Sequence, residues 1–130
     1  MTVRKYVLID DDDVIAILNP AVIHRVDPAA QIEVFRSSMD ALMYLSTLRK
    51  QGGAAPDYIF LDINMPLMNG FELLSSLSAE DEVFLQNTKV IILSSSMDKR
   101  DIEKSKQFKI IFDFSSKPLS IPYLTELLSK

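Results

Sequence analysis

Residues 6–13 read YVLIDDDD, four apolar residues followed at once by four aspartates. Apolar residues on consecutive positions, without alternation, are typical of a strand that is covered on both faces, as in a parallel sheet. The acids that follow such a strand lie at its carboxyl end, which is where open α/β sheets bind their ligands. This stretch therefore predicts a buried parallel strand, and it indicates which edge of the sheet carries the site.

The same pattern recurs along the chain. Including the first, five short apolar runs are rich in β-branched or aromatic residues: Tyr6–Ile9, Ile32–Phe35, Tyr58–Leu61, Val90–Leu93 and Ile110–Phe114. Segments with helical spacing lie between the runs and after the last one. Because strand and helix alternate five times, we predict an α/β fold. Its doubly wound, five-stranded parallel sheet has right-handed crossovers and helices on both faces.

The composition fits one domain and excludes several classes of protein. A chain of 130 residues with 48% hydrophobic residues can build an ordinary core, and we expect a single domain over residues 1–130. No apolar run is long enough to span a bilayer, so membrane insertion is not expected. The absence of cysteine excludes disulfides and thiolate metal sites, and it is compatible with the cytoplasmic location that we expect.

The charge argues against direct binding to nucleic acid. The net charge is −4, from 18 acids against 14 bases. A domain that relies on phosphate contacts usually has a basic excess or a basic stripe, and neither is visible in this sequence.

Polar side chains stand at the carboxyl ends of four of the five predicted strands. Asp10 and Asp11 end the first strand, Asp62 the third and Ser94 the fourth, and Lys117 follows the fifth. Three carboxylates that meet at one edge would raise one another's pKa unless a cation joins them. Mg²⁺ prefers oxygen ligands and is commonly held by one or two carboxylates together with phosphate oxygens. The pattern predicts a magnesium site with phosphate chemistry.

Asp62 is also suited to be a nucleophile, because carboxylates form acyl phosphates with activated phosphoryl donors. A bound Mg²⁺ would reduce the repulsion between the attacking carboxylate and the phosphoryl oxygens. Lys117 would then be a mobile cation that reaches the phosphoryl group, and Ser94 a hydroxyl donor to one of its oxygens.

Four segments in register resemble the receiver domains of two-component response regulators, of the single-domain, chemotaxis-regulator-like kind. They are VLIDDD at 7–12, FLDINMP at 60–66 with Asn69-Gly70, IILSS at 91–95 and SKP at 116–118. Their order and spacing extend the resemblance to the whole chain. It implies a flavodoxin-like sheet of strand order 2-1-3-4-5 and a stand-alone phosphorylation switch, which is not an enzyme in the usual sense.

The resemblance also implies a role for each matching residue. The roles are Asp10 and Asp11 as metal-binding acids, Asp62 as phosphoacceptor, Asn64 as a ligand through its backbone carbonyl, Ser94 as switch hydroxyl, Phe114 as switch aromatic, and Lys117 as phosphate-sensing lysine. The cofactor would be Mg²⁺. The donor would be a sensor histidine kinase or a histidine phosphotransfer protein, and the output a further, unidentified protein partner.

Four positions depart from the family pattern. Lys109-Ile110 stands where the family usually has a glycine before the fifth strand, and Ser94 replaces the commoner threonine. Phe114 lacks the hydroxyl of a tyrosine, so any aromatic switching must act by packing alone. Pro20 falls inside the first predicted helix, where it should kink or interrupt the helix.

Two other functions compete with this interpretation. The run Asp10–Asp13 followed by Val14 matches the signature of haloacid-dehalogenase phosphatases, with Asp10 as nucleophile and Asp12 as general acid, but it leaves Asp62 without a role. A receiver that works only as a protein-interaction module would show no Mg²⁺-dependent uptake of a phosphoryl group. Identifying the aspartate that becomes phosphorylated distinguishes the three hypotheses.

Overall fold

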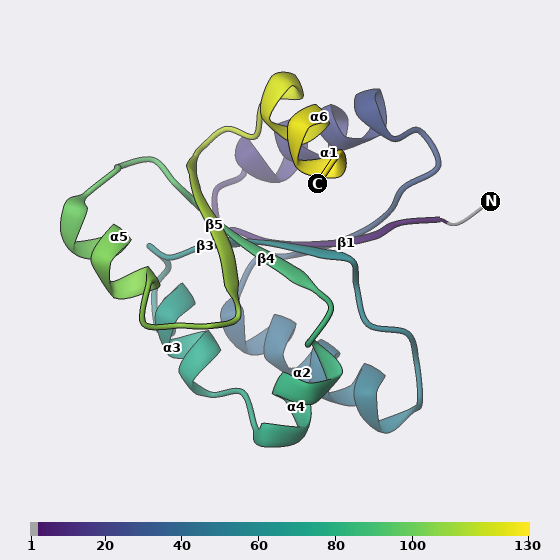
Figure 1. Ribbon diagram of the computed structural model, residues 1–130, viewed down its shortest axis with the longest axis vertical. Coiled ribbons are helices and arrows are strands. Elements are labelled where there is room, and N and C mark those ends of the chain that lie inside the picture. The colour runs from purple at the N-terminus through teal and green to yellow at the C-terminus, as the bar shows by residue number, and fades with distance from the viewer. Residues whose placement is uncertain (1–2) are drawn as a thin grey trace.

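The protein is described by a computed structural model over residues 3–130. Five parallel strands form one sheet in the order β2-β1-β3-β4-β5, which confirms the predicted fold class and strand order (Figure 1). The strands are β1 (Lys5–Ile9), β2 (Gln31–Phe35), β3 (Tyr58–Asp62), β4 (Lys89–Ser94) and β5 (Ile111–Ser116).

Helices cover both faces of the sheet. In Figure 1, α1 (Ile15–Val26) and α6 (Ile121–Leu128) lie together on one face, and α2 (Ser38–Lys50) lies on the other. The second face also carries α3 (Gly70–Ser75) and α4 (Ala79–Phe84), while α5 (Lys99–Ser105) stands beside β5. Within residues 3–130, every helix is too short or too polar to cross a membrane.

The crossover after β3 contains two short helices. The chain forms α3 and then α4, where the other crossovers contain one helix each. Ser78 begins the second helix, since its hydroxyl accepts a hydrogen bond from the Asp81 N–H while the Asp81 carboxylate accepts one from the Ser78 N–H. Such a capping box satisfies orphan amides and so favours a new helix start over continuation.

Pro20 lies inside the first helix without interrupting it, because α1 runs from Ile15 to Val26. Proline removes one intrahelical hydrogen bond and crowds the carbonyl four residues before it. Two buried neighbours hold the helix on either side of it: Ile23 packs in the core, and Asn19 accepts a hydrogen bond from the Leu119 N–H at 3.1 Å.

The core has two parts, one on each side of the sheet, and β1 contributes to both. Val7 and Ile9 pack on the side of α2 and α3, whereas Tyr6 and Leu8 pack on the side of α1 and α6. All four side chains are at most 3% exposed. Each such burial stabilises the fold by roughly 1.5–3 kcal/mol. The strand is thereby fixed, and with it the position of the acids that follow.

Candidate functional site

Three acidic side chains meet at the carboxyl edge of the sheet. Asp10 and Asp11 follow β1, and Asp62 is the last residue of β3, whose register with β1 pairs Ile9 with Leu61. One carboxylate oxygen from each lies within 4.8 Å of the other two. Asp10 and Asp62 are 6% and 2% exposed, whereas Asp11 is accessible to solvent. Two of the three acids are therefore removed from water.

Lys117 provides the cation that this crowding requires. It follows β5, and its Nζ donates to Asp10 Oδ2 at 3.0 Å and to Asp62 Oδ2 at 3.1 Å. Its side chain is only 10% exposed. The Lys117 N–H also donates to the Ser94 carbonyl at 2.9 Å, and the peptide bond from Lys117 to Pro118 is cis. The ammonium thus links two strand ends to a third.

The pKa values of Asp62 and Lys117 are both raised, and the causes reflect the charges that surround them. Burial raises the pKa of the Asp62 carboxyl and the charge of Asp10 adds to this, against hydrogen bonds from Asn64 and Lys117. Burial alone would lower the pKa of the Lys117 ammonium, but hydrogen bonds to Asp10 and Asp62 outweigh it and the pKa is raised. The lysine stays protonated at neutral pH, and the site keeps an excess of negative charge.

Backbone amides fix the direction of both buried carboxylates. Asp62 Oδ1 accepts from the Asn64 N–H at 3.0 Å, and Asp10 Oδ1 accepts from the Asp12 N–H at 2.9 Å. The other oxygen of each faces Lys117. Asn64 itself is exposed, and its carbonyl accepts no hydrogen bond from residues 3–130. Such a carbonyl is a suitable additional oxygen ligand.

Ser94 ends β4, which lies next to β3 in the sheet, and Phe114 lies on β5. The Ser94 Oγ is buried, donates to the Ser96 carbonyl at 2.7 Å and accepts from the Ser96 N–H at 3.2 Å. Phe114 is partly buried on β5, where it packs against the core and lines a cavity of about 510 Å³ with Met97 and Phe112. The hydroxyl is therefore engaged within its own turn.

Sequence reasoning gave no role to two residues that shape the site. Gly70 donates its N–H to the Ile63 carbonyl at 3.3 Å, and a Cβ at Gly70 would lie 2.7 Å from the Asp62 carbonyl oxygen. Arg36 follows β2 and donates from Nη2 to the Asp11 carbonyl at 2.9 Å. The sequence contained a signal for Arg36, because the second predicted strand was the one strand to whose carboxyl end no polar residue had been assigned.

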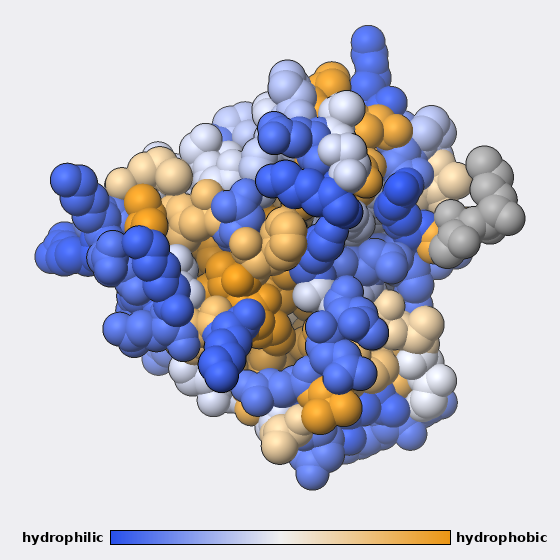
Figure 2. Space-filling model, in the orientation of Figure 1, coloured by the Kyte–Doolittle hydropathy of each residue, from blue (hydrophilic) through white to orange (hydrophobic). Residues whose placement is uncertain are grey.

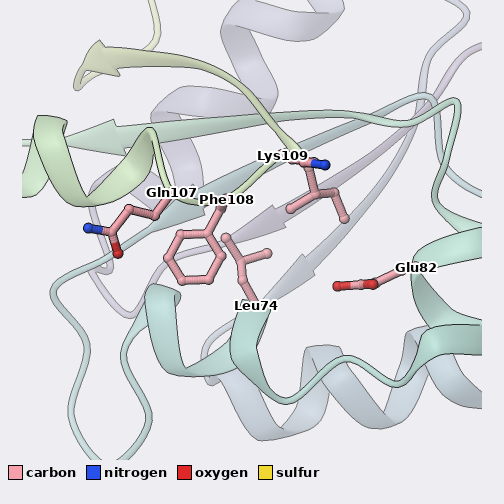
Figure 3. A pocket seen from close by; sticks show the side chains of 6 residues that line it. Leu74, Glu82, Gln107, Phe108 and Lys109 are labelled. Atoms are coloured by element: carbon pink, nitrogen blue, oxygen red, sulfur yellow. The ribbon is translucent and has the colours of Figure 1, made fainter.

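A second hollow lies away from the acids. Leu74, Glu82, Gln107, Phe108, Lys109 and Ile110 line a cavity of about 440 Å³. Figure 3 shows the side chains of Leu74 and Phe108 next to each other, with those of Glu82 and Lys109 farther away. Figure 2 shows apolar surface in a hollow on the same side of the molecule. The lining of the cavity includes Lys109 and Ile110, which stand where the family usually has a glycine.

The acids fit a hard divalent cation. The donor atoms are all oxygens, three of them from carboxylates within 4.8 Å of one another, and one carboxylate is open to solvent. Mg²⁺ is bound by such sets and keeps several water molecules. The fold and the site together define a flavodoxin-like α/β protein with an acidic cluster at the carboxyl edge of its sheet.

Comparison with known proteins agrees with this class. The sequence matches the response regulator receiver domain over residues 7–129. The crystal structure of a two-component response regulator from Cytophaga hutchinsonii is similar, with a TM-score of 0.89 and 32% sequence identity. The alignment covers 99% of this chain and 96% of that one. The chain belongs to the family of response regulator receiver domains, which act as signalling switches.

Two curated relatives are longer proteins. The protein-glutamate methylesterase/protein-glutamine glutaminase 1 of Xanthomonas oryzae pv. oryzae is 32% identical over 92 residues, which are 71% of this chain and 23% of that protein. The transcriptional regulatory protein MalR of Bacillus subtilis is 30% identical over 122 residues, or 94% of this chain and 47% of that protein. The chain thus spans about a quarter of the first relative and about half of the second.

The dehalogenase hypothesis finds no support in the geometry. Asp12, its general acid, is exposed, and its Oδ1 accepts hydrogen bonds from the N–H groups of Val14 and Ile15. The bond from Ile15 contributes most to lowering the pKa of Asp12. A carboxylate held in its ionised form at a helix start is a poor proton donor.

Proposed function

We propose that the chain is a phosphorylation switch in which Asp62 accepts the phosphoryl group. The observation that carries this proposal is the convergence of Asp10, Asp11 and Asp62 within 4.8 Å, with Lys117 hydrogen-bonded to two of them. Asp10, Asp11, Asp62 and the Asn64 carbonyl would hold Mg²⁺. Bound there, the ion would neutralise the phosphoryl oxygens as they approach the acids.

The transfer itself follows from the chemistry of a carboxylate. An Asp62 oxygen attacks the phosphorus of a phosphohistidine, and the new O–P bond forms as the P–N bond breaks. The imidazole leaves with the electron pair of that bond and takes up a proton. Lys117, already 3.1 Å from Asp62, can donate to the transferred group.

Switching would begin at Ser94. Its hydroxyl now closes a turn with Ser96, and a phosphoryl group on Asp62 would offer it a stronger, charged acceptor. Moving the hydroxyl would release that turn and the segment leading to α5. Phe114, beside the cavity between α5 and β5, would then repack. A local change of charge would thus alter a partner-binding surface.

The partners follow from the chemistry. The donor is a sensor histidine kinase or a histidine phosphotransfer protein, and the target is another protein that binds the altered surface. Because phosphohistidine is made from ATP, we place the reaction in the cytoplasm. We treat residues 1–130 as one receiver domain. The switch is not an enzyme in the usual sense, because the phosphoryl group is transferred to the protein itself.

Mass spectrometry after incubation with Mg²⁺ and phosphoramidate, a small donor with a P–N bond, tests the proposal. Wild type and Asp40→Asn, a control at an exposed aspartate on α2, should each gain one phosphoryl group, and Asp62→Asn none. A gain that persists in Asp62→Asn would contradict the assignment. Modification of Asp10 would favour the phosphatase hypothesis, and no gain in any chain would favour an interaction module.

A further inference from the structure

Arg36 occupies the one strand end that the proposed chemistry leaves unused. It follows β2, whose register with β1 pairs Phe35 with Ile9, and the Asp10 N–H donates to the Phe35 carbonyl at 3.0 Å. The segment after β2 therefore runs beside the run of aspartates after β1. Neighbouring parallel strands bring these two segments together although they are far apart in sequence.

The guanidinium makes two contacts with this run. Arg36 Nη2 donates to the Asp11 carbonyl at 2.9 Å and forms an ion pair with the Asp13 carboxylate. The carboxylates of the other two aspartates accept from backbone amides nearby in sequence: Asp10 from the Asp12 N–H, and Asp12 from the N–H groups of Val14 and Ile15. Asp10 also accepts from Lys117. Arg36 thus contacts the two aspartates of the run whose carboxylates accept no backbone hydrogen bond among residues 3–130.

Asp11 depends most on this contact. Among residues 3–130, no group donates a hydrogen bond to its carboxylate, which is nevertheless one of the three that converge. The direction of that carboxylate is set through the backbone of Asp11, and the Arg36 hydrogen bond fixes this backbone at its carbonyl.

We infer that Arg36 is a positioning residue for Asp11, which it holds in the orientation that a metal ion requires. This inference rests on the proposed function, because it concerns the same site. Groups that orient metal ligands commonly change metal affinity on the order of 10-fold to 100-fold when they are removed. Arg36 would act through its hydrogen bond, and its ion pair with Asp13 would offset its positive charge.

The sign of the effect separates this role from a simple charge effect. A positive charge beside a cation site opposes the metal, so removing Arg36 would tighten binding if only charge mattered. The Arg36 side chain is 50% exposed and that of Asp13 is 86% exposed, so salt would largely screen a charge effect. Loss of orientation would instead weaken binding at every salt concentration.

Calorimetric titration of the full chain with MgCl₂ tests the inference at low and high salt, well below the unfolding temperature. Arg36→Met should weaken Mg²⁺ binding on the order of 10-fold at both salt concentrations, and Arg36→Lys should recover part of the loss. The matched control is Arg100→Met, whose parent side chain is 92% exposed and pairs only with Asp98 among residues 3–130. Its affinity should equal that of wild type.

Asp13→Asn removes the ion pair but leaves the bond from Arg36 to the Asp11 carbonyl, so its loss should be smaller than that of Arg36→Met. Unchanged or tighter binding by Arg36→Met would overturn the inference, and so would an equal loss in Asp13→Asn. Backbone amide NMR of Asp11 and Asp12 adds a readout of orientation, since both resonances should shift in Arg36→Met before any metal is added. A wild type that binds no Mg²⁺ would instead contradict the proposed function.

Discussion

At the scale of single residues, the site is crowded and only partly neutralised. Asp10 and Asp62 are buried beside each other, and Lys117 is the cation that contacts both. Burying an ion pair is costly, but removing one partner from it is costlier, since an uncompensated charge remains. The stability of this region therefore depends on the cation that occupies it, either the lysine or an added metal ion.

Lys117→Met keeps the aliphatic packing of the side chain and removes its charge. We expect a loss of about 3 kcal/mol in the free energy of unfolding without Mg²⁺, the magnitude typical of a broken buried pair. Because the folded pKa of Lys117 is raised, its contribution is complete at neutral pH and is lost only as the pH rises through that value. Urea unfolding followed by circular dichroism measures the loss. A variant as stable as wild type would contradict the role of Lys117 as counter-ion.

Gly70→Ala tests how closely the start of α3 approaches the end of β3, where Asp62 lies. The added methyl group would lie 2.7 Å from the Asp62 carbonyl oxygen and 3.0 Å from the Ile63 Cα, both of them backbone atoms. We expect a loss of about 1–3 kcal/mol, the usual cost of overpacking, together with slower phosphorylation. Ser75→Ala, at an exposed position of the same helix, is the control. Equal stability of the two variants would show that the strand end moves freely.

At the scale of elements, α4 is fastened to α2 through one buried acid. Asp81 is 4% exposed and accepts from Arg49 Nε at 2.8 Å, besides capping its own helix through Ser78. Burial would raise the pKa of Asp81, but the hydrogen bonds from Arg49 and Ser78 outweigh it and the pKa is lowered. A six-residue helix such as α4 is too short to be stable alone.

Asp81→Ala should destabilise the protein by about 2–4 kcal/mol at neutral pH, from the lost ion pair and the lost cap. A carboxyl with a lowered folded pKa contributes stability above its unfolded value, and that contribution is lost as the pH falls through the folded value. The difference between variant and wild type should therefore shrink below about pH 4. Urea unfolding at several pH values checks this, and a difference independent of pH would refute it.

The limits of sequence reasoning also appear at this scale. Strands buried on both faces leave a clear apolar pattern, so β1, β3 and β4 and the polar residues at their ends could be predicted. The division between α3 and α4 could not, because it depends on side-chain capping by Ser78 and Asp81 against a continuous helical period. The role of Arg36 depends on which strand lies beside β1, and the engagement of the Ser94 hydroxyl on the shape of a turn. These are facts of tertiary structure.

At the scale of the whole molecule, the folded chain should be stabilised by Mg²⁺, since the acids converge only in the folded state. An ion present at ten times its dissociation constant adds about 1.4 kcal/mol. For a domain of this size, that raises the unfolding midpoint by roughly 3–6 °C. Thermal unfolding with MgCl₂ or EDTA measures the shift. Asp11→Asn should lose most of it, and a shift that remained complete would contradict a role for Asp11 in binding the metal ion.

The hydrogen bond between Lys117 and Asp10 joins residues that are 107 positions apart. A ribosome must therefore synthesise the chain past Lys117 before this contact can form. Until β5 has docked, the acids after β1 and β3 lack their lysine. Fragments that end before Lys117 should therefore leave these acids without a counter-ion.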